Sequence, residues 1–552
     1  MEYISYKESN ISETARKCHN KKYIEEKLVT EKEYFDKMYE KIDKTIKLDE
    51  NQRKIILTDE DYVMVIAGAG SGKTTTITAK VNYLIEKQNI KDNEIIVITF
   101  TNKAVDELKE RINNEFNHNI KITTFHKLGY EIIKNNTSLP PTINNNKINI
   151  LKIIIEQQIN SDKFLKQQLL KYFINQPYIT TKIKKIADSK QALSIKENDQ
   201  IAEECSTIIS LMKANNKSPE ELDKLTKKNK LEEKIIGFIK TIYIEYNREL
   251  NNQNQIDYDD MINNATQIIN QLKKQAPKYK MIIIDEYQDI SECRYNLVKA
   301  LSEKMNSKIM VVGDDWQCIY SFAASNINLF TQFKLNVPYC KIMKIESTYR
   351  NSQELINIAG RFIQKNDNQI SKTLKSKKQL KNPIKLVIYK NTEIKQKLKE
   401  IIEYIIEKYG KGKNILILGR YKNDIQKVIE KSEFTEIGSQ LIYNACPKVK
   451  IDYLTVHSSK GLGYDNVILI NAKNEKMGFP SKKQSNQIIE KLTIKENNIK
   501  YPEERRLFYV ALTRTKNEII ILTPSKKQSE FIKELKKYEN IEIISNIKNI
   551  KK

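Results

Sequence analysis

Short apolar runs divide the chain into two groups of predicted strands. The runs are rich in Ile and Val, as is typical of strands buried on both faces of a parallel sheet. The first group comprises residues 62–67, 95–99, 281–284 and 309–312, and the second comprises residues 415–418, 453–456, 467–470 and 519–522. One parallel sheet from each group gives an α/β fold with two lobes.

Helical spacing interrupts the first group of strands. Residues 135–250 contain almost no Gly, are dense in Lys, Gln and Asn, and place Ile150, Ile153 and Ile154 at helical intervals. We expect a helical subdomain at 135–250, inserted into a first lobe of residues 46–134 and 251–335. Residues 336–552 would form the second lobe. Residues 1–45, with helical periodicity near 34–42, would form an N-terminal accessory arm.

Net charge, cysteine pattern and apolar segments indicate the kind of binding partner and the cellular compartment only in part. A net charge of +25 attracts phosphate backbones or anionic membranes, although the general abundance of Lys, Asn and Ile could equally explain it. The six cysteines are scattered without a C-x-x-C pair, which favours free thiols in a reducing cytoplasm. Residues 1–30 lack the apolar segment of a secretory signal, and no apolar stretch approaches the roughly 18–20 residues that span a bilayer. A cytoplasmic protein is expected.

A glycine-rich loop follows the first predicted strand and precedes a helical pattern. Its spacing is that of a P-loop, although Ala stands at the first position where the stricter pattern has Gly. The loop residues are Ala67, Gly68, Ala69, Gly70, Ser71 and Gly72, followed by Lys73 and Thr74. Glycines let successive N–H groups face the phosphates of ATP, Lys73 supplies charge, and the Thr74 hydroxyl suits Mg²⁺.

Two carboxylates and two arginines are candidates for phosphoryl transfer. Asp285 and Glu286 follow the apolar run 281–284, so Asp285 can hold Mg²⁺ and Glu286 can take a proton from the attacking water. Arg350 and Arg514 lie in the second half of the chain, from where each could reach the γ-phosphate. Taken singly, either arginine fits a surface residue better than a catalytic one.

Taken in order, these motifs and those named below resemble the motifs of the UvrD/Rep helicases of superfamily 1. Their residues are most similar to those of the helicase IV branch. The resemblance covers about residues 48–130 and 255–525. It rests on segments 48–52, 67–74, 99–104, 124–126, 284–289, 313–320, 349–350, 456–462 and 503–514.

This resemblance implies roles for further residues. Gln52 would read the adenine edge, Tyr349 would stack on the base, and Gln317 would couple the phosphate site to DNA. Thr75 and Gly463 occupy positions near the nucleotide where many relatives carry Arg and Glu, and Ala323 and Ala324 replace bulkier or basic residues. The implied DNA track consists of Phe100, Asn102, His126, Tyr320, Phe322 and His457. Each aromatic residue of the track could alternatively belong to a core.

The implied function is an ATP-dependent helicase that moves 3′ to 5′ on single-stranded DNA with Mg²⁺ as cofactor. The stretch between Arg350 and Thr455 is too short for the large second-lobe insertion of many relatives, so we expect that insertion to be absent. Two alternatives remain. The motor could remodel a protein partner such as RNA polymerase, or serve a nuclease or phage-defence complex, with partner contacts through the N-terminal arm or the helical insert.

Overall fold

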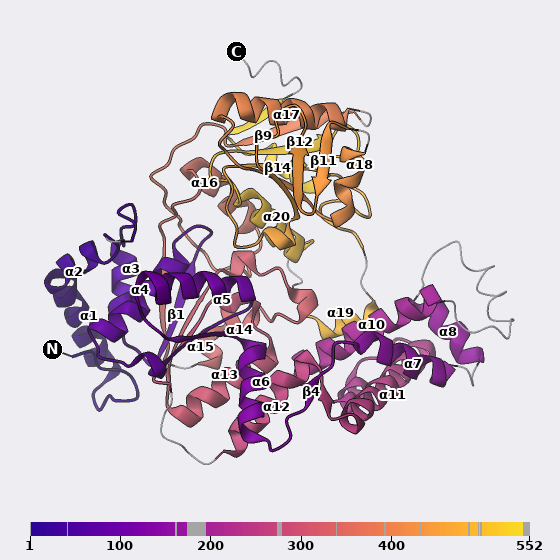
Figure 1. The fold of residues 1–552 in the computed structure, drawn as a ribbon, viewed down its shortest axis with the longest axis horizontal. Helices are drawn as coiled ribbons and strands as arrows, with labels where there is room; N and C mark the ends of the chain where they lie inside the picture. Colours follow the sequence, from indigo (N-terminus) through magenta and orange to yellow (C-terminus); the bar gives the residue numbers. More distant parts are fainter. Residues whose placement is uncertain are drawn as a thin grey trace.

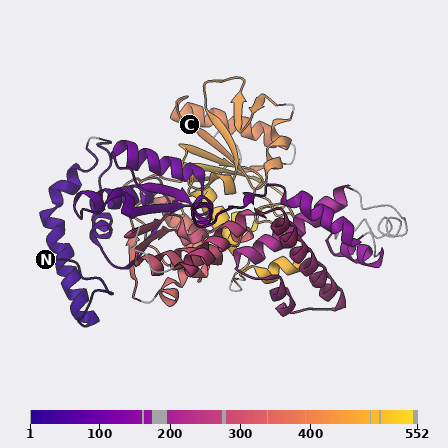
Figure 2. The same ribbon diagram turned by 60° about the horizontal axis from the view of Figure 1, so that its bottom comes forward.

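The structure is a computed structural model that describes residues 2–40, 42–159, 163–173, 195–272, 279–337, 339–390, 393–430, 432–483, 486–494, 496 and 499–544. Two α/β lobes are built on separate sheets, with a helical arm at one end of the first lobe and a helical insert at the other (Figure 1). The turned view keeps the arm and the insert at opposite ends and the second lobe above them (Figure 2). Within the described ranges, no helix is long and apolar enough to cross a bilayer.

The first lobe contains a parallel sheet of six strands in the order β3-β2-β6-β7-β1-β8. The strands are β1 (Tyr62–Ala67), β2 (Ile95–Thr99), β3 (Lys121–Thr124), β6 (Met281–Ile284), β7 (Lys308–Gly313) and β8 (Lys341–Ile345). The four predicted strands of the first group are adjacent in this sheet, which confirms that prediction. β3 and β8, its two edge strands, were not predicted.

Helices cover both faces of this sheet, which explains why its strands read as continuous apolar runs. α4 (Lys73–Glu86) and α5 (Asn102–Lys109) share one core with alternate strand residues such as Val65 and Val97. On the opposite face lie α6 (Phe125–Asn136), α12 (Tyr258–Gln271) and α13 (Glu292–Met305), whose core includes Ile66 and Ile98. A turn of π-helix (Glu110–Glu115) follows α5, and α14 (Asn328–Thr331) and α15 (Phe333–Asn336) precede β8.

The second lobe contains an eight-stranded sheet in the order β11-β12-β13-β10-β14-β15-β9-β16, and all its pairs except those of β12 are parallel. Its strands are β9 (Ile384–Tyr389), β10 (Ile415–Gly419), β11 (Phe434–Ile437), β12 (Gln440–Tyr443), β13 (Ile451–Thr455), β14 (Asn466–Leu469), β15 (Ile519–Pro524) and β16 (Ile541–Ile544). Its helices are α16 (Gln353–Ile363), α17 (Ile394–Tyr409), α18 (Gln426–Ile429), α20 (Pro502–Leu512) and α21 (Glu530–Leu535). The second group of predicted strands forms the centre of this sheet, so the expectation of two lobes is confirmed.

Elements of the second lobe itself occupy the chain from α16 to β13, as expected where the large insertion is absent. The expected domain limits stay predictions. Because β8 pairs with β1 in the first sheet, we propose that the first lobe extends to Ile345 rather than ending at residue 335.

The insert is helical, as predicted. It comprises α7 (Lys147–Ile159), α8 (Lys163–Phe173), α10 (Ile195–Ala214) and α11 (Lys230–Asn252), with a short pair of strands, β4 (Thr142–Ile143) and β5 (Gln255–Ile256), at its root. Residues 160–162 and 174–194 of the predicted insert lie outside the described residues. α19 (Gln487–Leu492), which belongs to the second lobe in sequence, packs against α10 beneath that lobe (Figure 1). The insert therefore contacts both lobes.

The N-terminal arm consists of α1 (Glu13–Thr30) and α2 (Lys32–Lys37), which lead to α3 (Glu50–Leu57). Its buried Tyr39 donates a hydrogen bond to the carbonyl oxygen of Thr75 at 2.9 Å, so the arm packs behind helix α4.

Candidate nucleotide and nucleic-acid site

The glycine-rich loop joins β1, which ends at Ala67, to α4, which begins at Lys73. Gly70 and Gly72 have φ angles of +69° and +81°, which residues with a side chain rarely adopt. A Cβ atom on Gly70 would lie 2.5 Å from Cβ of Arg350. Gly68, Ala69 and Ser71 complete the loop. Lys73 and Thr74 follow it in the first turn of α4, at the positive end of the helix, where anions bind well.

Asp285 and Glu286 follow β6 at the carboxyl edge of the first sheet. The Lys73 Nζ atom lies 3.4 Å from Glu286 Oε1. Burial, together with the neighbouring Glu286 carboxylate, raises the pKa of Asp285. Burial also opposes ionisation of Glu286, but Lys73 and Lys460 outweigh it and lower its pKa. Glu286 is therefore ionised at neutral pH, as a carboxylate that takes up a proton must be.

The two candidate arginines converge on the P-loop from the second half of the chain. Tyr349 N–H donates to the Gly70 carbonyl oxygen at 2.9 Å, which places Arg350 directly over the loop. Arg350 donates to the Gly461 carbonyl oxygen at 3.3 Å and Arg514 to the Leu462 carbonyl oxygen at 3.1 Å. Burial and the nearby Arg350 lower the pKa of Arg514 to about 9. A buried Arg514 and a half-buried Arg350 that repel each other favour an anion close to both.

Gln52 and Tyr349 flank the loop on the side where a base would lie. Gln52 is buried, and its Nε2 atom donates to Thr76 Oγ1 at 3.2 Å. The Tyr349 ring is 59% exposed, with its hydroxyl 3.2 Å from Asp49 Oδ2, so a flat face stays open for stacking. A Cβ atom on Gly72 would lie within 4 Å of Gln52, Thr75 and Tyr349, so these residues surround one position of the loop.

Gly463 lies against Arg350. A Cβ atom at this position would be 3.0 Å from Arg350 Nε, so a larger residue would press on the guanidinium. The absence of a side chain at residue 463 therefore leaves Arg350 room to lie over the loop.

The donor set at the loop fits Mg²⁺ brought by a nucleotide. Thr74 in the first turn of α4 and Asp285 after β6 offer a hydroxyl and a carboxylate at the same edge of the sheet. Mg²⁺ commonly takes only one or two protein oxygens and completes its shell with phosphate and water. Over the described part of the chain, no group of three His, Cys, Asp or Glu residues could hold a metal alone.

The segment after β7 connects the phosphate side to a second surface. The Gln317 amide donates to Asp314 Oδ2 at 2.6 Å and accepts from Arg514 Nη2 at 2.9 Å. Tyr320 and Phe322 follow a few residues later. One short stretch of the first lobe thus contacts a buried arginine of the second lobe and presents aromatic rings beyond it.

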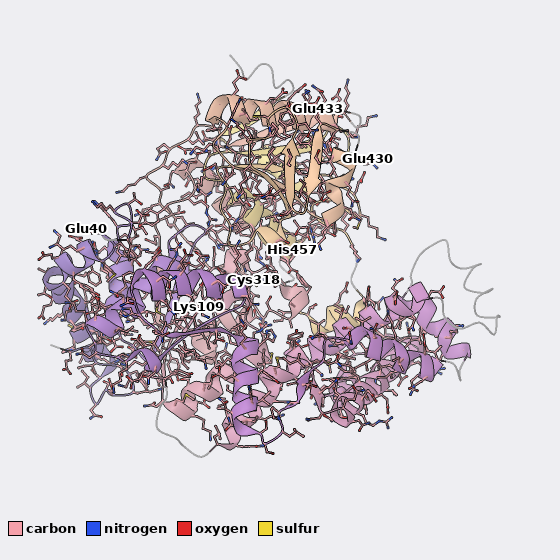
Figure 3. All side chains as sticks on the ribbon, in the orientation of Figure 1. Glu40, Lys109, Cys318, Glu430, Glu433 and His457 are labelled. Atoms are coloured by element: carbon pink, nitrogen blue, oxygen red, sulfur yellow. The ribbon has the colours of Figure 1, made fainter. Side chains whose placement is uncertain are left out.

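Tyr320, Phe322 and His457, which we call the aromatic cluster, lie together between the lobes. Ring centroids are 5.8 Å apart for Tyr320 and Phe322, and 5.7 Å apart for Phe322 and His457. Phe322 is 59% exposed, which argues against a core role for it. Figure 3 places His457 at the lower edge of the second lobe, above Cys318 of the first. Burial lowers the pKa of His457 to about 4, so its ring is uncharged at neutral pH.

The other predicted DNA-track residues follow the neighbouring strands β2 and β3 of the first lobe. Phe100 follows β2, but it packs partly against the core and Phe125. Asn102 is exposed at the start of α5. His126, in the first turn of α6, lies edge to face with Tyr258 at 5.8 Å, and burial lowers its pKa to about 4.

Sequence reasoning missed residues that the structure brings to these surfaces. Lys460, named only as part of a motif, reaches from the second lobe to Asp289 Oδ2 at 2.5 Å and lies 3.9 Å from Glu286 Oε2. The exposed Tyr258 extends the His126 surface, and Arg294 lies 5.3 Å from the Phe100 ring centroid. The motif that contains Lys460 gave it no role of its own, and the segments around Tyr258 and Arg294 carry too little local pattern to single them out.

The chain is similar to known helicases over most of its length. The profile of the UvrD/REP helicase N-terminal domain matches residues 48–338, and that of the UvrD-like helicase C-terminal domain matches residues 433–526. DNA helicase IV of Escherichia coli K12 is 28% identical over 95% of this chain and 74% of its own length. The ATP-dependent DNA helicase Rep of Buchnera aphidicola (subspecies Acyrthosiphon pisum) is 29% identical over 90% of this chain and 70% of its own. PcrA of Staphylococcus aureus is 25% identical over 71% and 51%.

Proposed function

Because the chain belongs to the UvrD/Rep helicase family, we propose that it moves 3′ to 5′ along single-stranded DNA as it hydrolyses Mg-ATP. Like the relatives named above, it is an ATP-dependent DNA helicase. The direction of movement and the single-stranded track are the parts of this function that we propose.

The continuity of the segment after β7 supports the coupling of hydrolysis to a strand, whereas the 3′ to 5′ direction rests on the family resemblance alone. Gln317 hydrogen-bonds Arg514 of the second lobe, and within five residues Phe322 exposes its ring beside His457. A shift of the arginine toward or away from a γ-phosphate would therefore move the segment that carries the aromatic rings. This is a short mechanical path from ATP to a strand.

On the phosphate side, each of the chain's own groups has a defined task. Lys73 exchanges its contact with Glu286 for phosphate oxygens, which leaves the Glu286 carboxylate free to take the proton of the attacking water. Arg350 and Arg514 balance the negative charge that develops on the transferred group. Mg²⁺ held by Thr74 and Asp285 would neutralise charge on the phosphates.

On the strand side, the rings of the aromatic cluster offer stacking faces. Stacking on unpaired bases contributes about 1–3 kcal/mol per base without sequence preference, as a moving motor requires. The exposed Phe322 is the best placed of the three. His126 and Tyr258 on the first lobe would continue the path.

The direction is tested by unwinding of duplexes that carry a single-stranded tail on either the 3′ or the 5′ side. We expect ATP-dependent unwinding of the 3′-tailed duplex and little of the 5′-tailed one, and none with Lys73→Ala. Preference for the 5′ tail would contradict the proposed polarity.

A further inference from the structure

A connecting segment between α16 and β9, residues 369–375, contacts three parts of the ATP site at once. The Leu374 side chain lies against the P-loop, where a Cβ atom on Gly68 would be only 2.7 Å from it. Lys375 N–H donates to the Glu346 carbonyl oxygen at 2.7 Å, beside the turn that carries Arg350. The Ile370 N–H donates to Asp315 Oδ2 at 2.7 Å. The segment is therefore held to the loop, to the arginine turn and to the end of β7.

Lys372 is the buried charge of this segment. Its Nζ atom pairs with Asp314 Oδ1 and lies 2.6 Å from Asp315 Oδ1, and the Lys372 side chain is 3% exposed while both carboxylates are fully buried. The ammonium also lies 4.6 Å from the centre of the Trp316 ring. Two adjacent buried carboxylates repel each other, and Lys372 is the cation that both of them contact.

The contact with Asp314 continues to Arg514. Lys372 occupies Oδ1 of Asp314, and Oδ2 accepts from the Gln317 amide nitrogen at 2.6 Å. A carboxylate can only accept here, so the Gln317 NH₂ group must face it and the Gln317 oxygen must face Arg514 Nη2, 2.9 Å away. The orientation of the amide thus depends on an aspartate that Lys372 holds in place.

We propose that Lys372 is a positioning residue for ATP hydrolysis, which acts through Asp314 to hold Gln317 toward Arg514. This inference rests on the proposed function, in which Gln317 and Arg514 link the phosphate site to the strand. Lys372 would be a third residue that supports this link. Lys372 itself contacts neither the P-loop nor the aromatic cluster among the contacts described.

The test compares Lys372→Met, Lys372→Arg and Lys375→Met, alone and, for Lys372→Met, combined with Gln317→Ala. Lys375 is a matched control because its side chain is exposed, and its contact with Glu346 is made by the backbone N–H, which the Met variant keeps. We expect Lys372→Met to lower kcat about tenfold, within the range for neighbours in one hydrogen-bond network, with KM for ATP changed less than about twofold. Lys372→Arg should recover part of the loss, and Lys375→Met should match the wild type.

The double variant decides whether Lys372 acts through Gln317. If it does, Lys372→Met should cause little further loss of kcat in a Gln317→Ala background. Losses that multiply in full, or a folded Lys372→Met protein with wild-type kcat, would overturn the proposal. Thermal unfolding of each variant shows whether a loss of kcat comes from misfolding. If Lys372→Met is misfolded, Lys372→Arg decides instead. A Lys372→Arg protein with wild-type stability but a kcat as low as that of Gln317→Ala would also overturn the proposal.

Measuring the same variants with and without single-stranded DNA distinguishes a failure of this inference from a failure of the proposed function. A wild-type protein whose turnover does not respond to single-stranded DNA would contradict the proposed function, while the comparison of kcat values without DNA would still decide the role of Lys372.

Discussion

The ATP cleft and the helical insert are built on different principles. In the cleft, charged side chains from short motifs pair with each other, such as the half-buried Lys73 with Glu286 and the buried Lys460 with Asp289. The core of the insert is largely apolar, and its buried Lys213 pairs with Asp257 and Asp260. A cleft of this kind is specified by residue type at fixed spacing, because phosphate chemistry tolerates few substitutes. An apolar core accepts many sequences of similar volume.

The contact between α19 and the insert also lacks the sequence motifs that mark the cleft. Ile488 is fully buried against the insert, Lys491 Nζ lies 2.5 Å from Glu232 Oε1, and the Asn215 amide donates to the Leu492 carbonyl oxygen at 3.5 Å. These partners are far apart in sequence and carry no recognisable motif. A contact between the second lobe and the insert is therefore visible only in the folded chain.

The largest effect should come from the arginines of the cleft. Arg350→Ala and Arg514→Ala should each lower kcat by about 10³-fold or more, the range for an arginine that stabilises phosphoryl transfer. Steady-state ATP hydrolysis with saturating DNA measures this. Arg361→Ala is the control, because Arg361 is exposed on α16. Hydrolysis at the parent rate by Arg350→Ala would remove this arginine from the site.

A smaller effect should separate the aromatic cluster from the insert surface. Phe322→Ala should weaken binding of an oligo(dT) strand by about 1–3 kcal/mol, the usual worth of stacking on one base. Phe164 on α8 of the insert is equally exposed, at 59%, and serves as the matched control. Fluorescence anisotropy gives both affinities. If Phe322→Ala lost no more oligo(dT) affinity than Phe164→Ala, the strand would not bind at the aromatic cluster.

The contact between α19 and the insert should affect stability more than catalysis. Ile488→Ala should lower the free energy of unfolding by about 2–5 kcal/mol, as for other buried aliphatic truncations, and leave the KM for ATP unchanged. Ile494→Ala, at a residue that is 39% exposed, should change it by less than about 0.5 kcal/mol. Denaturant unfolding compares the two variants. Similar stabilities would mean that α19 contributes little to the fold.

The smallest effect concerns the histidine of the aromatic cluster. Burial lowers the pKa of His457 to about 4, so its ring stays neutral from pH 6 to 8 and His457→Phe should leave the pH dependence of DNA affinity in that range unchanged. Anisotropy titrations at pH 6, 7 and 8 test this. Tighter binding at pH 6 that disappears in His457→Phe would show that the ring becomes charged.

The central strands and the main motifs could be predicted from the sequence because each carries a local signal. β2 and β6 are uninterrupted apolar runs, and the P-loop has both its spacing and its strand–loop–helix setting. The edge strand β8 escaped prediction because two lysines, Lys341 and Lys344, break its apolar pattern where it faces solvent. Charged residues are typical of exposed sheet edges.

Lys372 and Lys460 could not be singled out for a related reason. The chain has 95 Lys and Arg residues, so Lys372 does not stand out in the sequence, and the motif that contains Lys460 does not show which residues Lys460 contacts. Their importance comes from contacts with Asp314 and Asp289, which precede them by many residues. Residues whose role depends on distant partners need the structure.

We propose above all that hydrolysis in the cleft is coupled to a strand on the aromatic cluster. Steady-state ATPase activity with and without single-stranded DNA tests this coupling most directly. The measurement is repeated across a salt series with Lys73→Ala as the inactive control. We predict strong stimulation by DNA that falls as salt rises, because phosphate contacts release counterions. Lys73-dependent turnover that DNA does not stimulate would contradict the claim and favour RNA or a protein partner instead.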